Sequence, residues 1–187
     1  MARTSGINQD KILEVAEAII AAKGAKDTSL KDIAKAVGIS KGTLYYHYST
    51  KEALVYDITA RHFDQVIRRM VRLTGKVGQK VGQEEILTLL LEDLGAQQQI
   101  SRLHLYLLHE VMSGNEDLLA RYTDRYREWQ DTMRSFLSGL FGEEHPAHAA
   151  ASAILMTFIE GNTVRGTVFE ESAPYREMAL CITRLYG

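Results

Sequence analysis

Side chains suited to contact with a polyanion gather in one short stretch, SKGTLYYHYSTKEAL, at residues 40–54. It holds three tyrosines, one histidine and two lysines beside a single glycine. These side chains can donate hydrogen bonds to phosphate oxygens, and a tyrosine ring can also lie against a sugar or a thymine methyl group. Contact with nucleic acid is the chemistry that this composition indicates.

The basic charge of the chain lies in the same part. Residues 1–80 hold 14 Lys and Arg against 8 Asp and Glu, a net charge of +6, whereas the remaining residues hold 8 against 16, a net charge of −8. An excess of six could be an ordinary solvated surface. Beside a matching motif it is the distribution expected for contact with a polyanion.

The residues before this stretch have the pattern of two helices. Apolar residues recur at helical spacing over about 8–23, and Lys23-Gly24 provides a stop. Ser29 stands three residues before Asp32, a capping-box spacing that predicts the start of a second helix. Gly38, which adopts positive φ readily, is suited to end that helix.

Two further helices follow directly. Ser40 is placed to cap a short third helix, and Ser49 with Glu52 to cap a fourth that continues to about residue 74. Only two residues separate the second helix from the cap of the third. This arrangement is a helix-turn-helix, with the third helix as its recognition helix.

The third helix is predicted to have two faces. At 100° per residue, Leu44 and Tyr48 share one side, where they would pack on Ile19, Ile33 and Val37, while the opposite side presents Gly42, Tyr45 and Tyr46. A core role cannot serve both pairs of large residues, because the pairs point apart. A protein–protein patch remains the alternative for the outward tyrosines.

Each outward residue has an expected contact with DNA. Lys41 and Thr43 lie in the first turn, where a recognition helix presents side chains to base edges, and Gly42 lets the backbone come close. Tyr45 and His47 are placed to hydrogen-bond phosphates. Lys51 is expected to bind a phosphate with its ammonium group at the start of the fourth helix.

The stretch from Ile12 to Leu54 resembles the N-terminal DNA-binding domain of the TetR family of transcription regulators. The resemblance rests on SLKDIAKAVGISKGTLYYHYSTKEAL, which has the family's second helix, GIS turn, recognition helix and KEAL start of helix four in order. It covers about a quarter of the chain. It implies groove and phosphate contacts for Lys41, Gly42, Thr43, Tyr45, Tyr46 and His47, a backbone-proximal cap for Ser29 and a phosphate clamp for Lys51. Tyr48 stands where the family often has phenylalanine.

The resemblance also implies an all-helical homodimer whose C-terminal domain binds a small molecule and thereby lowers DNA affinity. Five further apolar segments, at about 84–97, 101–113, 116–140, 147–170 and 173–186, bring the expected total to about nine helices. We expect an all-α chain with a DNA-binding domain at residues 1–50 and a regulatory and dimerisation domain at 51–187. The helix at about 50–74 connects them, and the polar segment 75–83 follows it as a loop.

The last two helices are the most apolar pair. The resemblance implies that they form a four-helix interface with a second copy of the chain, and several small residues would permit close approach: Ala150, Ala153, Gly161 and Gly166. Packing within one chain is the alternative interpretation.

One helix of the expected regulatory domain carries a stripe of large side chains at i, i+4, i+7 and i+11: Tyr122, Tyr126, Trp129 and Met133. Such a stripe is more often core than pocket, but aromatic and methionine side chains also line ligand cavities. Three polar residues in apolar stretches complete the predicted ligand site: His104, Asn162 and Arg165. The last two could equally lie at the dimer interface, and His104 could be solvated.

The remaining signals are negative or weak. We find none of the sequence motifs of phosphate-cradling loops, dinucleotide sites, serine hydrolases or zinc proteases, so we expect no enzyme activity, no catalytic residue, no metal and no cofactor. Cys181, the single cysteine, is expected to be a packed thiol. With no apolar signal core and no membrane-length apolar run, the chain is expected to be cytoplasmic.

The sequence thus predicts a ligand-responsive transcription regulator. It would be a homodimeric repressor released from a palindromic double-stranded DNA operator by a small molecule, with activation left open as the direction of regulation. The rival interpretations are a helical protein whose helix-turn-helix binds another protein, and an acidic helical enzyme with an appended binding domain.

Overall fold

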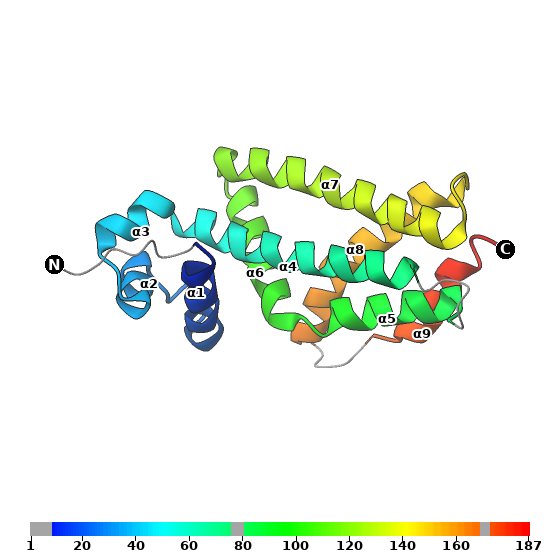
Figure 1. Ribbon diagram of the computed structural model, residues 1–187, viewed down its shortest axis with the longest axis horizontal. Helices are drawn as coiled ribbons and strands as arrows, with labels where there is room; N and C mark the ends of the chain where they lie inside the picture. The colour runs from blue at the N-terminus through cyan, green and yellow to red at the C-terminus, as the bar shows by residue number, and fades with distance from the viewer. Residues whose placement is uncertain (1–8, 76–80, 169–172) are drawn as a thin grey trace.

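The computed structural model describes residues 9–75, 81–168 and 173–187 (Figure 1). All nine elements found there are helices, which confirms the predicted all-α fold. In chain order they are α1 (Gln9–Lys23), α2 (Leu30–Val37), α3 (Lys41–His47), α4 (Lys51–Thr74), α5 (Gln83–Gly95), α6 (Gln98–Met112), α7 (Glu116–Phe141), α8 (Ala147–Val168) and α9 (Tyr175–Thr183).

Local signals set the ends of the first helices. The Ser29 side chain accepts from the backbone N–H of Asp32, and the Asp32 carboxylate accepts from the backbone N–H of Ser29, so the predicted capping box is present. Gly38 ends α2 with φ of 80°, a conformation that costs glycine little. The predicted cap of α4 was wrong by one residue, because the hydroxyl of Thr50, and not of Ser49, accepts from the N–H of Ala53.

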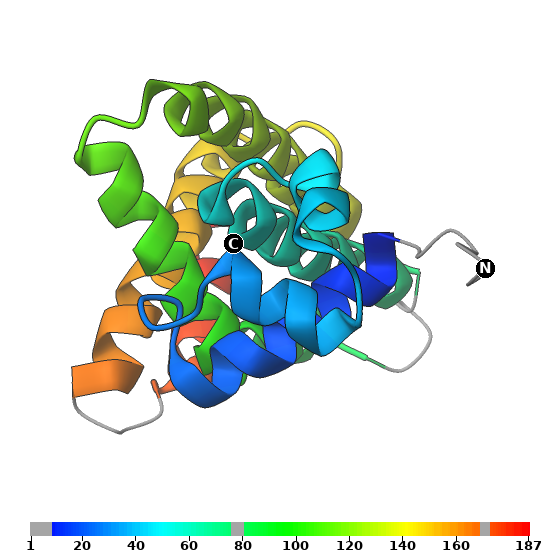
Figure 2. The same ribbon diagram turned by 90° about the vertical axis from the view of Figure 1, so that its left-hand side faces the viewer.

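The long helix α4 joins the two ends of the molecule (Figure 1). Helices α1, α2 and α3 gather at its N-terminal end, which faces the viewer in Figure 2. Helix α7 runs beside α4 in the same direction, and α6 also packs against α4. Helix α8 packs against α7 and α6, whereas α9 packs mainly against α5.

Two buried clusters hold these helices together. The first surrounds α1 to α3 and the N-terminal half of α4, and it continues into α6 and α7 through Leu103, Leu107, Leu118 and Tyr122. The second joins the C-terminal half of α4 to α5, α7, α8 and α9. The apolar core of the helix-turn-helix therefore includes residues from beyond position 51, where the sequence predicts a domain boundary.

The last two helices are separated in the single chain, because α9 lies mainly on α5. Cys181 is exposed rather than packed. Most of the predicted loop at 75–83 lies outside the described residues. In the described ranges, none of the helices combines the length and apolarity needed to span a membrane.

Candidate nucleic-acid interface and regulatory cavity

Two buried residues fix α3 against the rest of the domain. Leu44 and Tyr48 are buried in the first cluster with Ile33, and Ile19 and Val37 pack against that cluster, as the sequence predicts. The Tyr48 backbone N–H closes the helix by donating to the Leu44 carbonyl. Burial raises the pKa of the Tyr48 hydroxyl, which therefore stays protonated and able to donate a hydrogen bond.

The opposite face of α3 is open. Tyr46 is 88% exposed and Tyr45 is 43% exposed, and all four of the other predicted contact residues on the helix are exposed: Lys41, Gly42, Thr43 and His47. The Lys41 ammonium lies 5.2 Å from the centre of the Tyr45 ring, so a cation and an aromatic ring are presented together. The division of the recognition helix into two faces is observed.

Ser29 and Lys51 make contacts within the chain. The Ser29 hydroxyl lies 2.5 Å from the Asp32 carboxylate, and hydrogen bonds from Ser29 hold the pKa of Asp32 below its ordinary value. Lys51 Nζ donates to the Ala25 carbonyl at 2.7 Å and lies 5.5 Å from the centre of the Tyr106 ring. The ammonium that the sequence assigns to a phosphate thus lies on the turn between α1 and α2.

Two small cavities lie between α4, α5, α6, α7 and α8. Their volumes are about 30 Å³ and about 20 Å³, and both are walled by Phe63, Val66, Leu94 and Ile159. The first is also lined by His104, and the second by Trp129 and Met133. Each has room for about one water molecule.

Three of the predicted pocket residues meet in an aromatic cluster beside these cavities. The Tyr122 hydroxyl lies 2.6 Å from Nε2 and 2.7 Å from Nδ1 of the buried His104, so one imidazole nitrogen is its partner. Burial lowers the pKa of His104 to about 4. The histidine is therefore neutral at physiological pH, and the interpretation of a solvated His104 was wrong. The Trp129 ring lies 5.9 Å from that imidazole.

Three further predicted pocket residues do not line the cavities, whereas Met133 lines the second one. Tyr126 is half-buried with its ring 6.5 Å from Trp129, Asn162 is half-buried and Arg165 is exposed. None of these three lines either cavity. Sequence reasoning missed the role of Phe63, which stacks on Trp129 at 3.8 Å, because its helical spacing in α4 is equally typical of a core residue.

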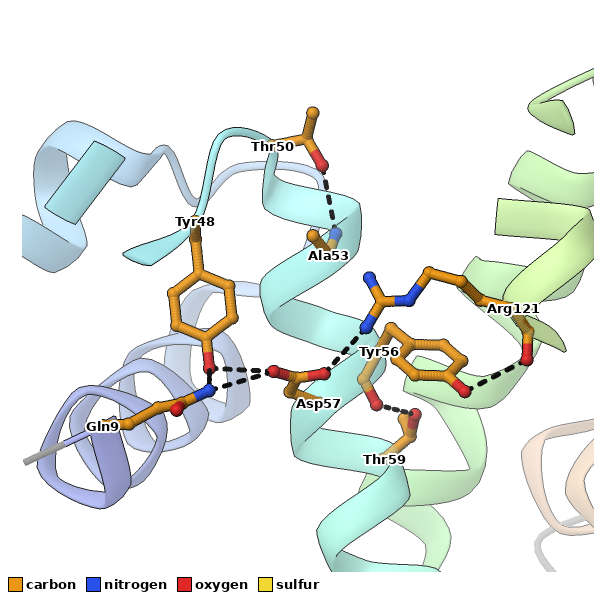
Figure 3. A network of polar contacts seen from close by, with 8 residues as sticks. All are labelled: Gln9, Tyr48, Thr50, Ala53, Tyr56, Asp57, Thr59 and Arg121. Carbon is orange, nitrogen blue, oxygen red and sulfur yellow. Dashed lines mark hydrogen bonds and ion pairs between the residues drawn. The ribbon is translucent and has the colours of Figure 1, made fainter. Parts of the chain in front are cut away.

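A polar network between the two parts of the chain was also missed (Figure 3). Asp57 Oδ2 accepts from the Tyr48 hydroxyl at 3.0 Å and from Gln9 Nε2 at 3.2 Å. Asp57 Oδ1 accepts from Arg121 Nη2 in α7 at 3.0 Å. The contacts span 9 to 64 positions of sequence, so no local pattern indicates them.

Comparisons with known proteins agree with this geometry. Residues 12–58 match the family model described as bacterial regulatory proteins, tetR family. The chain is 34% identical over 61 residues to the HTH-type transcriptional repressor KstR2 of Mycolicibacterium smegmatis, which is 33% of this chain and 30% of that protein. The match thus spans less than a third of the relative's length.

Solved structures resemble the chain over its whole length. A putative TetR-family transcriptional regulator from Mesorhizobium loti has a TM-score of 0.74 at 18% identity, with all of both chains covered. The regulator FadR from Bacillus subtilis in complex with stearoyl-CoA has a TM-score of 0.68 at 17% identity, covering 96% of this chain and 98% of that one. At such identities the likeness shows a shared fold. Residues 12–58 therefore match the helix-turn-helix domain of the tetR family of bacterial regulatory proteins, and the whole chain shares the fold of a putative regulator from that family.

Proposed function

We propose that this chain is a ligand-responsive, DNA-binding transcription regulator that acts as a repressor. The observation that carries the proposal is the exposed face of α3, where Tyr45, Tyr46 and Lys41 point outward while Leu44 anchors the helix from behind. Large aromatic side chains seldom remain this exposed together without a partner. The repressor KstR2, which resembles residues of the same domain, supports the direction of regulation.

The DNA-binding residues are those of the exposed face: Lys41, Gly42, Thr43, Tyr45, Tyr46 and His47. Lys41 and Thr43 read base edges in a major groove, and Tyr45 and His47 contact phosphates. Ser29 positions the start of α2 near the DNA backbone through its cap. Lys51 contributes as a phosphate contact only if its ammonium leaves the Ala25 carbonyl, so we expect a smaller role for it than for Lys41.

The regulator acts as a homodimer with α8 at the centre of the interface. Along α8, exposed small or apolar residues recur at helical spacing: Ala150, Ala153, Ile154, Gly161, Val164 and Val168. A Cβ atom added at Gly161 would meet nothing within 4 Å, so this face is open to close approach by a second helix. Two copies would place two recognition helices about 34 Å apart on a palindromic operator.

The effector is a small, largely apolar molecule that enters between α4 and α7. The walls of the two cavities are mostly apolar, and among the described residues none accepts a hydrogen bond from the buried indole Nε1 of Trp129. A ligand with a hydrogen-bond acceptor would satisfy that donor. FadR, which shares the fold, was solved with stearoyl-CoA, so this architecture can hold an apolar chain.

Ligand pockets typically measure roughly 300 Å³ or more, far above the present cavities of about 30 Å³ and about 20 Å³. A ligand must therefore move the surrounding helices apart. A 100-fold loss of operator affinity requires about 2.7 kcal/mol of coupling, which is an ordinary value for allostery.

The test is a band-shift series with the DNA upstream of the chain's own gene, measured from low to high salt. A regulator should bind with sequence preference and a steep loss of affinity as salt rises, because phosphate contacts release counterions. Weak binding that is indifferent to sequence and salt would contradict the proposal and favour a helix-turn-helix that binds protein.

A further inference from the structure

We propose that Asp57 is a positioning residue that couples the recognition helix to the contact between α4 and α7. The inference rests on the regulatory function proposed above. Each oxygen of this carboxylate serves a different part of the chain: Oδ2 accepts from Tyr48 and Gln9, and Oδ1 accepts from Arg121 (Figure 3). Asp57 thus connects the end of α3 and the start of α1 to α7 through one rigid group.

Asp57 lies on the same helix as the cavity wall, so a ligand in the cavity could act on the Asp57–Arg121 pair. Helices α4 and α7 run in parallel, and along their contact Asp57 meets Arg121, Asp64 meets Arg125 and Phe63 stacks on Trp129. Phe63 is six residues after Asp57, about 9 Å along the helix. A molecule that enters between Phe63 and Trp129 must part the two helices, and a rigid helix carries that movement to the Asp57–Arg121 pair.

Arg121 is itself held against α4 by Tyr56. The Tyr56 hydroxyl donates to the Arg121 carbonyl at 3.1 Å, and the guanidinium lies 4.1 Å from the centre of the Tyr56 ring (Figure 3). The arginine therefore cannot follow α7 away from α4 while it keeps all these contacts. A movement of α7 therefore changes the contact between Arg121 and Asp57, because the arginine side chain is not free to compensate for it.

On the other side of Asp57, Tyr48 transmits the change to α3. Tyr48 is the C-cap of that helix and its ring is buried, so the hydroxyl position and the backbone position are tied together. When Arg121 no longer holds Oδ1, the carboxylate gains rotational freedom and the hydrogen bond from Tyr48 weakens. The last turn of α3 then becomes less well fixed.

Amide hydrogen exchange of the full chain, without DNA or ligand, tests this link. The Arg121→Ala variant should speed exchange of the Tyr48 amide, which is bonded to the Leu44 carbonyl, by about threefold, while amides of α9 remain unchanged. Arg121→Lys should restore most of the protection. Arg127→Ala is the matched control, because Arg127 lies on the same helix and pairs only with Asp124 on its own helix among the described residues. Unchanged exchange at Tyr48 in Arg121→Ala would overturn the proposal.

A double-variant cycle separates coupling from general destabilisation. If Tyr48→Phe and Arg121→Ala act through the same carboxylate, the double variant should show about the same exchange at Leu44 and Tyr48 as the more affected single variant. Multiplication of the two single factors would contradict a shared route.

Operator binding gives an independent outcome. Arg121→Ala should weaken binding about threefold without changing the salt dependence, because no phosphate contact is lost. A reduced salt slope would show instead that Arg121 touches DNA, and would refute the positioning role. If the unmodified chain failed to bind DNA, the proposed regulatory function would be refuted. The exchange experiment would still report whether Asp57 links the end of α3 to α7.

Discussion

At the residue scale, the functions of neighbouring side chains in α3 are separated by direction. Leu44 and Tyr45 are adjacent in sequence, yet the first is fully buried and the second is 43% exposed. Successive helical residues differ by 100° in direction, so one short helix can both complete a core and present a binding face. A substitution at Tyr45 should therefore affect mainly DNA binding, and a substitution at Leu44 mainly the stability of the fold.

Tyr45→Ala should weaken operator binding roughly tenfold, the effect of about one hydrogen bond to a charged phosphate, with little loss of stability. Leu44→Ala should instead lower the free energy of unfolding by about 2–5 kcal/mol, because it leaves a cavity in the core. Fluorescence anisotropy and urea denaturation measure the two effects. Equal losses of stability would show that the two faces are wrongly assigned.

His104 predicts a pH dependence of stability. Its pKa is lowered by burial to about 4, whereas in an unfolded chain it returns to about 6.5. Between these values the unfolded state binds more protons, so the free energy of unfolding should fall as the pH drops from about 6.5 to about 4, by up to roughly 3 kcal/mol.

Urea denaturation of His104→Gln at pH 7.5 and pH 5 checks this dependence. The variant should lose less stability than the unmodified chain between the two pH values. His109→Gln is the control, since the side chain of His109 is 78% exposed and its loss should leave the dependence unchanged. Parallel pH profiles for His104→Gln and the unmodified chain would contradict the assignment of a neutral buried imidazole.

At the element scale, α4 contributes residues to both buried clusters. Its first turn follows α3 after three residues, its N-terminal half carries Asp57, Phe63 lies at its middle, and its C-terminal half packs in the second buried cluster. One continuous helix thus contacts both the recognition helix and the walls of the cavities. The N-terminal cap of α4 matters because this end of the helix follows α3, which carries the proposed DNA contacts.

The cap of α4 gives a prediction at this scale. Thr50→Ala should destabilise the chain by about 1 kcal/mol, since the Ala53 N–H loses its partner. Ser49→Ala should cost much less, because Ser49 is exposed and lies outside the cap. Chemical denaturation of both variants measures the difference, and a larger cost for Ser49→Ala would restore the assignment made from sequence.

At the scale of the whole molecule, α8 has a row of exposed apolar side chains that no helix described in the single chain covers. Ile154, Val164 and Val168 are 44%, 50% and 64% exposed on one helix, beside the small residues Ala153 and Gly161. A row of apolar side chains with small residues between them is typical of a helix that packs on another. A second copy of the chain would supply that partner.

Ile154→Arg should therefore shift the chain from a dimer to a monomer of 21.0 kDa in light scattering, because a charge would be buried at the interface. Operator affinity should fall with it. Met112→Arg is a suitable control, since Met112 is 85% exposed at the end of α6 and its substitution should leave the mass unchanged. A monomeric mass for the unmodified chain at micromolar concentration would contradict the proposed interface.

The sequence by itself determined the features that depend on near neighbours. Helix periodicity, the capping box of Ser29 and the turn at Gly38 predicted α1 to α3, because caps and turns are made within a few residues. The same 100° rule separated Leu44 from Tyr45. The one-residue error at α4 arose because Ser49 and Thr50 are both competent caps, and only the path of the backbone selects between them.

Only the tertiary structure decided contacts between distant segments. The stack of Phe63 on Trp129, the Lys51 ammonium on the Ala25 carbonyl and the bridge from Tyr48 through Asp57 to Arg121 join residues from separate segments of the chain. An amphipathic pattern states which face of a helix is buried but not which helix will cover it. For the same reason the stripe on α7 indicated the burial of Tyr122, Trp129 and Met133, while Asn162 and Arg165 do not line the cavities that the stripe adjoins.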